Sequence, residues 1–340
     1  MRTYRVGVLG LDHWYWATAF IPRLLTSRRA TLAAIWEPRD WRLRATKYPA
    51  ERVAARPEEI TDDPDIDVVV SFLPCPASAR WLARAARNGK ALVCNKPLAM
   101  TPAAGLPIVA ALRRTRRPSY ALEGGAALTR RARFIRRLVR QNAIGRPLTG
   151  FASMRGGMPM AWWDRGGKTG RAHWGWWTDP RLVPGGAWID HAIYALPEFG
   201  FMLGDVPRRV GATMANLAHR AAMPGLEDYG LATYVYGRGT VVTMEYDWIG
   251  RMGSFHSLVG TQGALRWGHG VEQGCIELMT GKGKKLLKIP AGREESVLEH
   301  LVRCLDERRE TVSPASSGLA NLRAALAAYR SARLRRAVSV

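Results

Sequence analysis

Three side chains in this sequence are of types that can move a proton at an alcohol or carbonyl carbon: Lys96, Asp190 and Tyr194. Oxidation of an alcohol by hydride transfer requires a base for the hydroxyl proton, and the reverse reduction requires the same group as an acid. An isolated tyrosine has a pKa of about 10, which is too high for a base near neutrality, but a lysine ammonium close to the phenol lowers that pKa. We therefore interpret Lys96 and Tyr194 as a candidate acid/base pair, with Asp190 orienting substrate hydroxyls or the lysine.

The spacing around these residues indicates where each would lie. Lys96 follows the apolar run Ala91–Cys94, and ligands of open α/β sheets bind at the carboxyl ends of the strands. Asp190 and Tyr194 are four residues apart in an apolar segment that begins Gly185-Gly186, so they share one face of a predicted helix. The alternative for that helix is an ordinary buried element in which Tyr194 is a core aromatic residue.

The first 120 residues alternate apolar, β-rich runs with amphipathic helical stretches, which indicates a parallel sheet covered by helices on both faces. We expect strands at Arg5–Leu9, Thr31–Trp36, Ile66–Phe72, Ala91–Cys94 and Ser119–Leu122. We expect helices at Trp14–Ser27 and Pro76–Asn88, and a third after Thr101-Pro102. Residues 1–122 are thus predicted to form a doubly wound, Rossmann-like dinucleotide-binding domain of an α/β protein.

Beyond the basic stretch at residues 130–141, the pattern changes to long β-rich segments. We expect strands at Leu148–Met154, Arg208–Leu217, Gly230–Tyr236, Thr240–Trp248 and Ser254–Gly260, and helices at Glu294–Glu307 and Ser317–Arg335. Gly237-Arg238-Gly239 is typical of a hairpin turn, so a large, mostly antiparallel sheet is favoured. Residues 123–340 are predicted to form an α+β domain that binds substrate and makes a homo-oligomer, a dimer or tetramer, through this sheet.

The turn after the first strand is a candidate cofactor site, made up of Gly7, Gly10, Leu11, Asp12, His13 and Trp14. Gly10 matches the first glycine of the dinucleotide fingerprint, whereas Asp12 and Tyr15 replace the second and third. Asp12 adds negative charge where a pyrophosphate would lie, and the alternative is a tight turn without a ligand. At the end of the second strand, Glu37 favours NAD and Arg39 could pair with the extra phosphate of NADP, so both cofactors stay open.

Two of these segments resemble the Gfo/Idh/MocA family of oxidoreductases. Asn95-Lys96-Pro97 resembles the family's Glu-Lys-Pro segment. Gly185-Gly186 to Tyr194 resembles its Gly-Gly…Asp-x-x-x-His helix, with tyrosine in the histidine position as in the sugar-oxidising and dihydrodiol-oxidising branches. The run Ile66–Pro74 also looks like the family's fourth strand, with Ser78 where a histidine is common. The resemblance implies that Lys96 lies at the nicotinamide and substrate, and that the cofactor also contacts Leu73, Pro74, Ser78, Asn95 and Pro97.

The resemblance further implies a NAD(P)-dependent dehydrogenase or reductase acting on a sugar, cyclitol or similar polyhydroxylated small molecule. Two alternatives stay open. One, suggested by Asp12 and Tyr15, is a relative that has lost redox turnover and serves as a binding or regulatory protein. The other is a lyase or hydrolase that keeps NAD tightly bound and oxidises its substrate transiently.

Tryptophans gather before and within the second motif: Trp162, Trp163, Trp174, Trp176, Trp177 and Trp188. They could form a substrate wall, although packing is expected to account for most of them. Trp177 is a candidate substrate contact because an arginine is common there in the family, and His191 is a second candidate. His173 and His191 lack the carboxylate or cysteine spacing of a metal site, so no metal is expected.

Composition limits the class of protein. The chain has 340 residues, 47% of them hydrophobic, and no apolar segment of the roughly 20 residues that a membrane helix needs. Its start does not resemble a signal peptide, so we expect a cytoplasmic protein with no membrane partner. The net charge of +23 favours anionic partners, but no nucleic-acid-binding signature accompanies it, so we interpret it as a solvated, arginine-rich surface.

Overall fold

A computed structural model of the chain describes residues 2–159, 175–250 and 253–340. The chain forms two compact units. Unit 1 comprises Met1–Gly124, Met160–Pro184 and Glu295–Leu322, and unit 2 comprises Gly125–Pro159, Gly185–Glu294 and Arg323–Val340. Each unit is therefore assembled from three stretches of chain, and the division into residues 1–122 and 123–340 stays a prediction.

Unit 1 is built on a six-stranded parallel sheet in the order β3-β2-β1-β4-β5-β6, which confirms the predicted doubly wound fold. The strands are β1 (Tyr4–Leu9), β2 (Ala30–Trp36), β3 (Arg52–Val53), β4 (Val68–Ser71), β5 (Ala91–Cys94) and β6 (Ser119–Ala121). Every residue of β4 and β5 is buried, as is typical of a parallel sheet covered on both faces.

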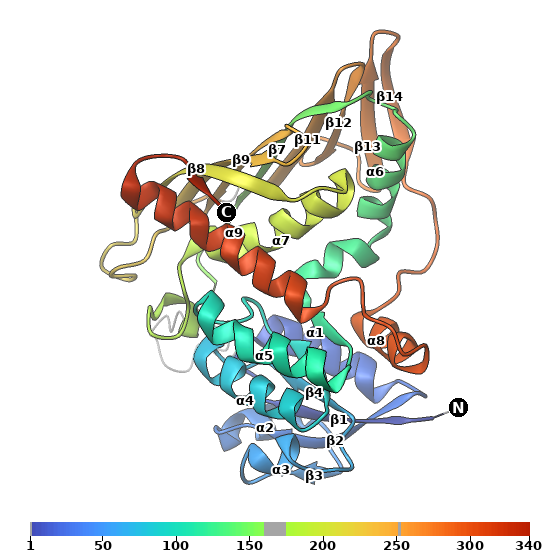
Figure 1. Ribbon diagram of the computed structural model, residues 1–340, viewed down its shortest axis with the longest axis vertical. Coiled ribbons are helices and arrows are strands. Elements are labelled where there is room, and N and C mark those ends of the chain that lie inside the picture. The colour runs from blue at the N-terminus through green and yellow to red at the C-terminus, as the bar shows by residue number, and fades with distance from the viewer. Residues whose placement is uncertain (1, 160–174, 251–252) are drawn as a thin grey trace. The chain divides into compact units, whose positions relative to one another are not determined.

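Helices cover this sheet: α1 (Trp14–Leu25), α2 (Asp40–Thr46), α3 (Glu58–Thr61), α4 (Cys75–Arg87), α5 (Pro102–Thr115) and α8 (Val297–Asp306). The helix α4 packs against α5, and α1 packs against α8 (Figure 1). Thr101 caps α5 by accepting the N–H of Ala104 at 3.2 Å, and Pro102 begins the helix. Leu298 and Leu301 of α8 join the core around β1 and α1, so this late segment completes the first unit.

Unit 2 holds a nine-stranded sheet in the order β14-β13-β12-β11-β7-β10-β9-β8-β15. The strands are β7 (Pro147–Arg155), β8 (Pro207–Ala215), β9 (Tyr229–Tyr236), β10 (Val241–Asp247), β11 (Gly253–Gly260), β12 (Gly263–Gly268), β13 (Cys275–Thr280), β14 (Gly283–Lys288) and β15 (Val338–Ser339). β7 and β10 pair parallel and the other neighbours pair antiparallel. The mostly antiparallel sheet is as predicted, and β12, β13 and β14 extend it beyond the predicted strands.

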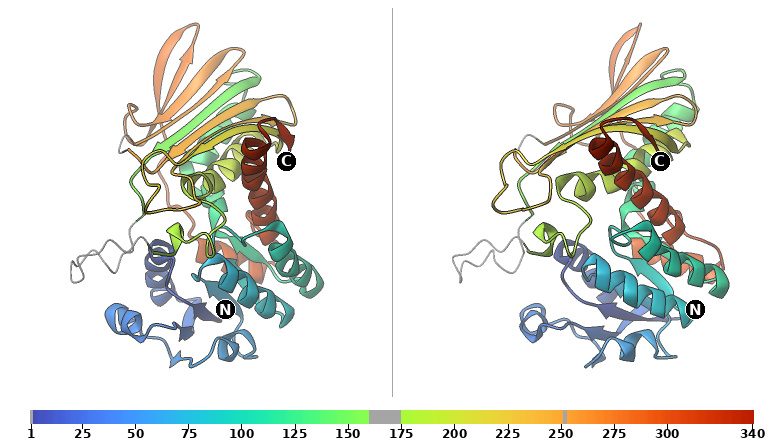
Figure 2. Two further views of the ribbon diagram at one scale, coloured as in Figure 1. Left: turned by 90° about the vertical axis from the view of Figure 1, so that its left-hand side faces the viewer. Right: turned by 60° about the vertical axis from the view of Figure 1, so that its left-hand side comes forward.

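The helix α7 (Ala187–Leu203) lies against one face of this sheet (Figure 2). Trp188 stacks on Tyr234 with ring centres 6.3 Å apart, and Phe199 approaches Trp267 at 6.2 Å. The helix α6 (Arg130–Arg140) packs beside α7, and α9 (Ala315–Leu334) begins in unit 1 and ends in unit 2. Within the described ranges, every helix is too short or too polar to span a bilayer.

Candidate functional site

A buried hydrogen-bond chain joins the loops that follow β1, β4 and β5. Asn95 donates from Nδ2 to the carbonyl of Leu73 at 2.6 Å, which leaves its Oδ1 to accept from His13 Nδ1. The backbone N–H of His13 donates to the carbonyl of Phe72 at 2.8 Å. Asn95 therefore fastens three loops at the carboxyl edge of the sheet, directly before Lys96.

The turn after β1 requires its glycine. Gly10 has a φ of +72°, and a Cβ there would lie 2.3 Å from Cδ2 of Leu73. Gly7 lies earlier, inside β1, where a Cβ would lie 2.4 Å from Cγ2 of Ile60, so its visible role is to let α3 approach the strand. Leu11, the residue after Gly10, is fully buried. Cofactor contacts of Gly7 and Leu11 stay predictions.

Asp12 and Glu37 are buried acids whose charge is balanced by two arginines. Asp12 Oδ1 accepts from Arg39 Nη1 at 2.7 Å and from Arg42 Nη1 at 2.9 Å. Glu37 Oε2 accepts the backbone N–H of Leu11 at 2.6 Å, and its Oε1 accepts that of Arg39 at 3.1 Å. Burial raises the pKa of Glu37, and nearby Arg42 opposes that rise. The negative charge that Asp12 brings into the glycine turn is thus offset within the cluster.

This geometry fits a dinucleotide. The helix α1 begins at Trp14, its N-cap His13 makes no side-chain capping bond, and its first turn contains no acidic residue. Such an end favours a phosphate, since backbone N–H groups and the helix dipole both point to it. Gly10 would let the backbone approach the pyrophosphate. Arg39, whose side chain is 49% exposed, follows the end of β2, where doubly wound folds bind the adenosine ribose, and its contact with the cofactor stays a prediction.

The predicted contacts after β4 occupy the start of α4. Pro74 is the N-cap of that helix, and Leu73 precedes it and is buried. Ser78 is fully buried one turn further on, and its hydroxyl has no hydrogen-bond partner among the residues that the structure describes. Burial raises the pKa of the neighbouring Cys75 thiol to about 12, which makes it a poor nucleophile.

Lys96 lies against a wall of aromatic rings. The lysine is 1% exposed, it precedes a cis peptide bond to Pro97, and its Nζ lies 5.6 Å from the ring centre of Tyr15. Tyr15 stacks on Trp177 at 6.2 Å with an interplanar angle of 13°. Trp176 stacks on Trp177 at 4.9 Å and donates its indole N–H to the carbonyl of Asp12 at 3.2 Å. Tyr15, in the third glycine position, is therefore part of this wall. Trp162, Trp163, Trp174 and His173 lie outside the described residues.

Glu123 is a buried acid that the sequence analysis missed. It follows Leu122 just beyond the end of β6, it is fully buried, and neither carboxyl oxygen has a hydrogen-bond partner in the described part of the chain. Burial raises its pKa to about 7, and the charge of Lys96 opposes that rise. Its position after a buried strand at the carboxyl edge is the signal that could have identified it.

The Gly-Gly start of α7 is held by a second acid that the sequence analysis missed, Glu227. Its Oε1 accepts the N–H groups of Gly186 at 2.8 Å and Trp188 at 2.9 Å, and the hydroxyl of Tyr329 at 2.7 Å. A Cβ on Gly186 would lie 1.9 Å from the carbonyl oxygen of Glu227, and a Cβ on Gly185 would lie 1.8 Å from the Tyr329 hydroxyl. The two glycines are therefore required by this packing.

The polar residues of α7 share one face. Asp190, His191 and Tyr194 are half-buried, and His191 Nδ1 lies 4.0 Å from Asp190 Oδ2. These residues belong to unit 2 and Lys96 to unit 1, so the predicted acid/base pair draws one residue from each unit and stays a prediction. Among the described residues, no cluster of histidine, cysteine or acidic side chains could hold a metal ion.

Comparisons with known proteins cover both units. Residues 4–120 match a family model described as an oxidoreductase family with an NAD-binding Rossmann fold, and residues 132–266 match the GFO/IDH/MocA C-terminal domain. One curated relative is dTDP-3,4-didehydro-2,6-dideoxy-alpha-D-glucose 3-reductase of Saccharopolyspora spinosa. It is 26% identical over 279 residues, which are 78% of this chain and 74% of the relative.

Solved structures share the fold over the whole length. Aldose-aldose oxidoreductase from Caulobacter crescentus, complexed with glycerol, aligns with a TM-score of 0.83 and 23% identity and covers 100% of both chains. Levoglucosan dehydrogenase in complex with NADH and levoglucosan aligns with a TM-score of 0.83 and 17% identity, covering 100% of this chain and 99% of the other. At these identities the likeness establishes the fold and leaves the substrate open.

Proposed function

Since the chain belongs to the Gfo/Idh/MocA family of oxidoreductases, whose first domain is an NAD-binding Rossmann fold, we propose that it moves hydride at a hydroxyl or carbonyl carbon of a sugar, cyclitol or similar polyhydroxylated small molecule. The observation that carries the proposal is the setting of Lys96. A buried ammonium lies at the carboxyl end of β5, beside a charge-balanced glycine turn and an aromatic wall. The named activities of the curated sugar reductase and of levoglucosan dehydrogenase support the substrate class.

Each residue has a role in this proposal. A bound nicotinamide dinucleotide would supply or accept the hydride. The Tyr194 phenol takes the hydroxyl proton during oxidation and returns it during reduction, and Lys96 lowers the pKa of that phenol by its positive charge. Asp190 orients substrate hydroxyls or the lysine. Trp177 is 2% exposed and stacks on Tyr15 and Trp176, so it supports the aromatic wall, and its substrate contact stays a prediction.

Buried hydrogen bonds and aromatic packing around Lys96 explain why it would stay in place. Asn95 ties the segment to His13 and to the carbonyl of Leu73, so the backbone before the lysine is fixed by buried hydrogen bonds. The aromatic wall excludes water on one side, which strengthens the electrostatic effect of the ammonium. The Glu227 contacts hold the start of α7 and would thereby fix the position of Asp190 in its first turn.

Two measurements test the proposal. The first is a titration with NADH and with NADPH that follows fluorescence transfer from tryptophan to the bound nicotinamide. Binding of either dinucleotide at micromolar to low millimolar concentration is expected, and binding of neither would end the proposal. The second is a panel of polyols and ketoses, assayed with both cofactors by nicotinamide absorbance. Cofactor binding with no redox change on any member would favour a binding protein, and NAD retained through purification without net redox would favour a lyase or hydrolase.

Matched variants distinguish a loss of the acid/base pair from a general effect of removing a buried polar group. Lys96→Met and Tyr194→Phe should each lower kcat by at least about a hundredfold while dinucleotide binding persists, because general acid/base groups contribute on that order. Lys90→Met removes another buried lysine, at the opposite edge of the sheet, and Tyr236→Phe removes a buried hydroxyl without a partner among the described residues. Both controls should keep kcat near the wild-type value. Equal losses of kcat in the test variants and the controls would contradict the roles assigned to Lys96 and Tyr194.

A further inference from the structure

A cavity of about 420 Å³ opens in unit 1 at the end of α5. Its wall contains five arginines, which are Arg113, Arg116, Arg117, Arg308 and Arg309, and one acidic residue, Glu310. The volume lies within the roughly 300–1,000 Å³ of small-molecule sites in proteins. The cavity therefore combines the size of a ligand site with a strong positive charge.

Most of this charge is not compensated by the protein. Arg113, Arg116, Arg117 and Arg308 form no ion pair or side-chain hydrogen bond with any residue in the ranges 2–159, 175–250 and 253–340. Arg309 differs, because it pairs with Glu307 and donates from Nη1 to the carbonyl of Glu310 at 3.3 Å. Four guanidinium groups around one cavity repel one another, and an anion bound between them would relieve that repulsion.

Cations at the carboxyl end of a helix commonly complement the helix dipole, and Arg113 in the last turn of α5 fits that ordinary role. Arg116, Arg117 and Arg308 lie beyond the last turn of α5 or α8. Arg116 and Arg308 have φ values of 53° and 50°, so the chain turns sharply after each helix and brings both arginines to the same cavity. The dipole alone does not account for this convergence of two helix ends.

The cavity is distinct from the dinucleotide site. Pro118 and Ser119 in its wall stand at the amino end of β6, whereas Lys96 follows the carboxyl end of β5. Because β5 and β6 run parallel, the two places are at opposite edges of the sheet. Ser316, in the first turn of the long helix α9, also lines the cavity, so the positive end of that helix adds to the charge of the arginines.

We propose that this arginine cavity is a second binding site of unit 1, which takes a small molecule carrying two or more phosphate groups. Each guanidinium group can donate two parallel N–H bonds to the oxygens of one phosphate. Several guanidinium groups therefore suit a ligand with more than one phosphate. Val109, Leu112 and Pro118 form an apolar part of the wall on which the body of such a ligand can rest. The concave shape favours a small ligand over a nucleic-acid backbone, which follows an open groove.

Inorganic pyrophosphate is the probe for the test, titrated into the full chain by calorimetry at physiological ionic strength and again in the presence of saturating NADH. Saturable binding is expected under both conditions. Arg116→Gln with Arg308→Gln should weaken it by at least about tenfold, since each removes a charge-assisted contact. Arg23→Gln with Arg28→Gln removes the same charge from exposed arginines outside the cavity and should leave the affinity within about twofold. Arg113→Gln with Arg117→Gln is a second test pair in case the first pair impairs folding, which thermal unfolding would reveal.

Several outcomes would overturn the proposal. Absence of binding at millimolar pyrophosphate is one, and equal losses in the cavity pair and the surface pair are another, because they indicate general attraction to a basic protein. Displacement of pyrophosphate by NADH, without an effect of the cavity substitutions, would place the anion at the glycine turn. A duplex oligonucleotide that displaces pyrophosphate at physiological salt would assign the surface to nucleic acid. NADH binding is measured separately by fluorescence, so a failure of the proposed oxidoreductase activity would not be confused with a failure here.

Discussion

Glu37 accepts the backbone N–H of Leu11 at 2.6 Å, so the acid at the end of β2 is bonded to the glycine turn of its own unit. Its side chain is 0% exposed, whereas that of Arg39, two residues later, is 49% exposed. A ribose diol would have to compete for a carboxylate that is already hydrogen-bonded, while a 2′-phosphate would meet an accessible guanidinium.

We therefore expect NADPH to bind more tightly than NADH. Arg39→Gln should lower the affinity for NADPH by about tenfold and that for NADH by less than about threefold, because the loss concerns one charge-assisted contact to phosphate. Asp12 keeps Arg42 as a partner, so the turn should stay folded. The readout is fluorescence transfer from tryptophan, and Arg44→Gln, an exposed arginine in the adjacent helix α2, is the control. Equal losses for both dinucleotides would contradict the assignment.

The buried carboxyl of Glu123 predicts a loss of stability as the pH rises from about 4.5 to about 7. Its pKa is raised from 4.5 to about 7 in the folded chain, so the folded state favours the protonated acid. That stabilisation is complete below about 4.5 and is lost as the pH rises through about 7, by on the order of 3 kcal/mol in the free energy of unfolding. Glu123→Gln mimics the protonated acid and should remove this pH dependence in urea unfolding. Glu51→Gln, at an exposed acid, should retain it, and an unchanged pH profile in Glu123→Gln would refute the prediction.

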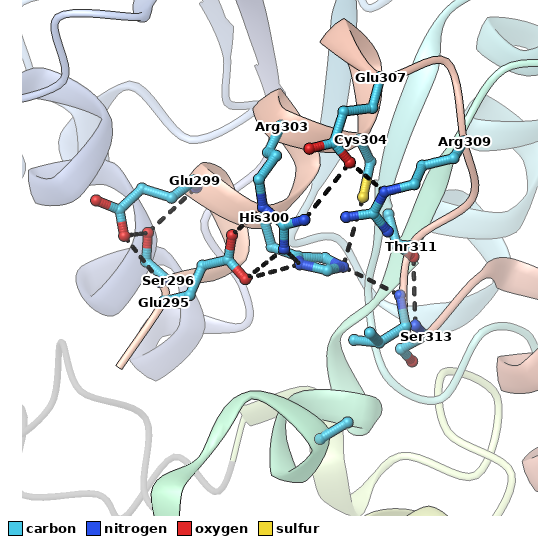
Figure 3. Close-up of polar contacts among 12 residues, drawn as sticks. Glu295, Ser296, Glu299, His300, Arg303, Cys304, Glu307, Arg309, Thr311 and Ser313 are labelled. Atoms are coloured by element: carbon cyan, nitrogen blue, oxygen red, sulfur yellow. Dashed lines mark hydrogen bonds and ion pairs between the residues drawn. The ribbon is translucent and has the colours of Figure 1, made fainter. Parts of the chain in front are cut away.

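His300 predicts the opposite dependence, which is a loss of stability as the pH falls. Figure 3 shows its ring between Glu295 and Cys304, and Nδ1 lies 2.9 Å from Glu295 Oε2. Nε2 accepts the backbone N–H of Val312 at 3.0 Å, which requires an unprotonated nitrogen there. Burial lowers the pKa of His300 below its ordinary 6.5, against the raising effect of Glu295.

The direction of this pH dependence follows from the fact that the folded chain favours the neutral form of His300. Stability from a neutral His300 is present above about 6.5 and declines as the pH falls toward its lower folded-state pKa, because the unfolded chain then binds the proton more readily. Glu295 remains ionised throughout, since Arg303 holds its pKa at about 2. His300→Gln should be less stable at neutral pH yet lose less stability between about pH 7 and 5, measured by urea unfolding. His269→Gln, at an exposed histidine, should follow the wild-type profile.

The packing of Glu227 against Gly186 predicts that only glycine is tolerated at position 186. Gly186→Ala places a methyl group 1.9 Å from the Glu227 carbonyl oxygen, so either the start of α7 or the loop before β9 must move. We expect a destabilisation of at least about 2 kcal/mol, measured by thermal unfolding, in line with overpacked sites. Gly211→Ala in β8, where a Cβ meets nothing within 4 Å, is the matched control and should cost far less. Similar unfolding temperatures for the two variants would show that the close approach is not rigid.

Local patterns in the sequence determined the parallel sheet, the position of Lys96 after a buried strand and the start of the helix that carries Asp190 and Tyr194. These features depend on residues that are neighbours in the chain, so periodicity and turn residues report them. Only the tertiary structure decided that Arg42 neutralises Asp12 from 30 residues away, that Glu227 anchors Gly186 across 41 residues, and that Glu295–Leu322 returns to the first unit. Charge balance and burial arise from contacts between distant segments, which short-range patterns do not encode; this is why Asp12 looked unfavourable for a dinucleotide in the sequence and is compensated in the fold.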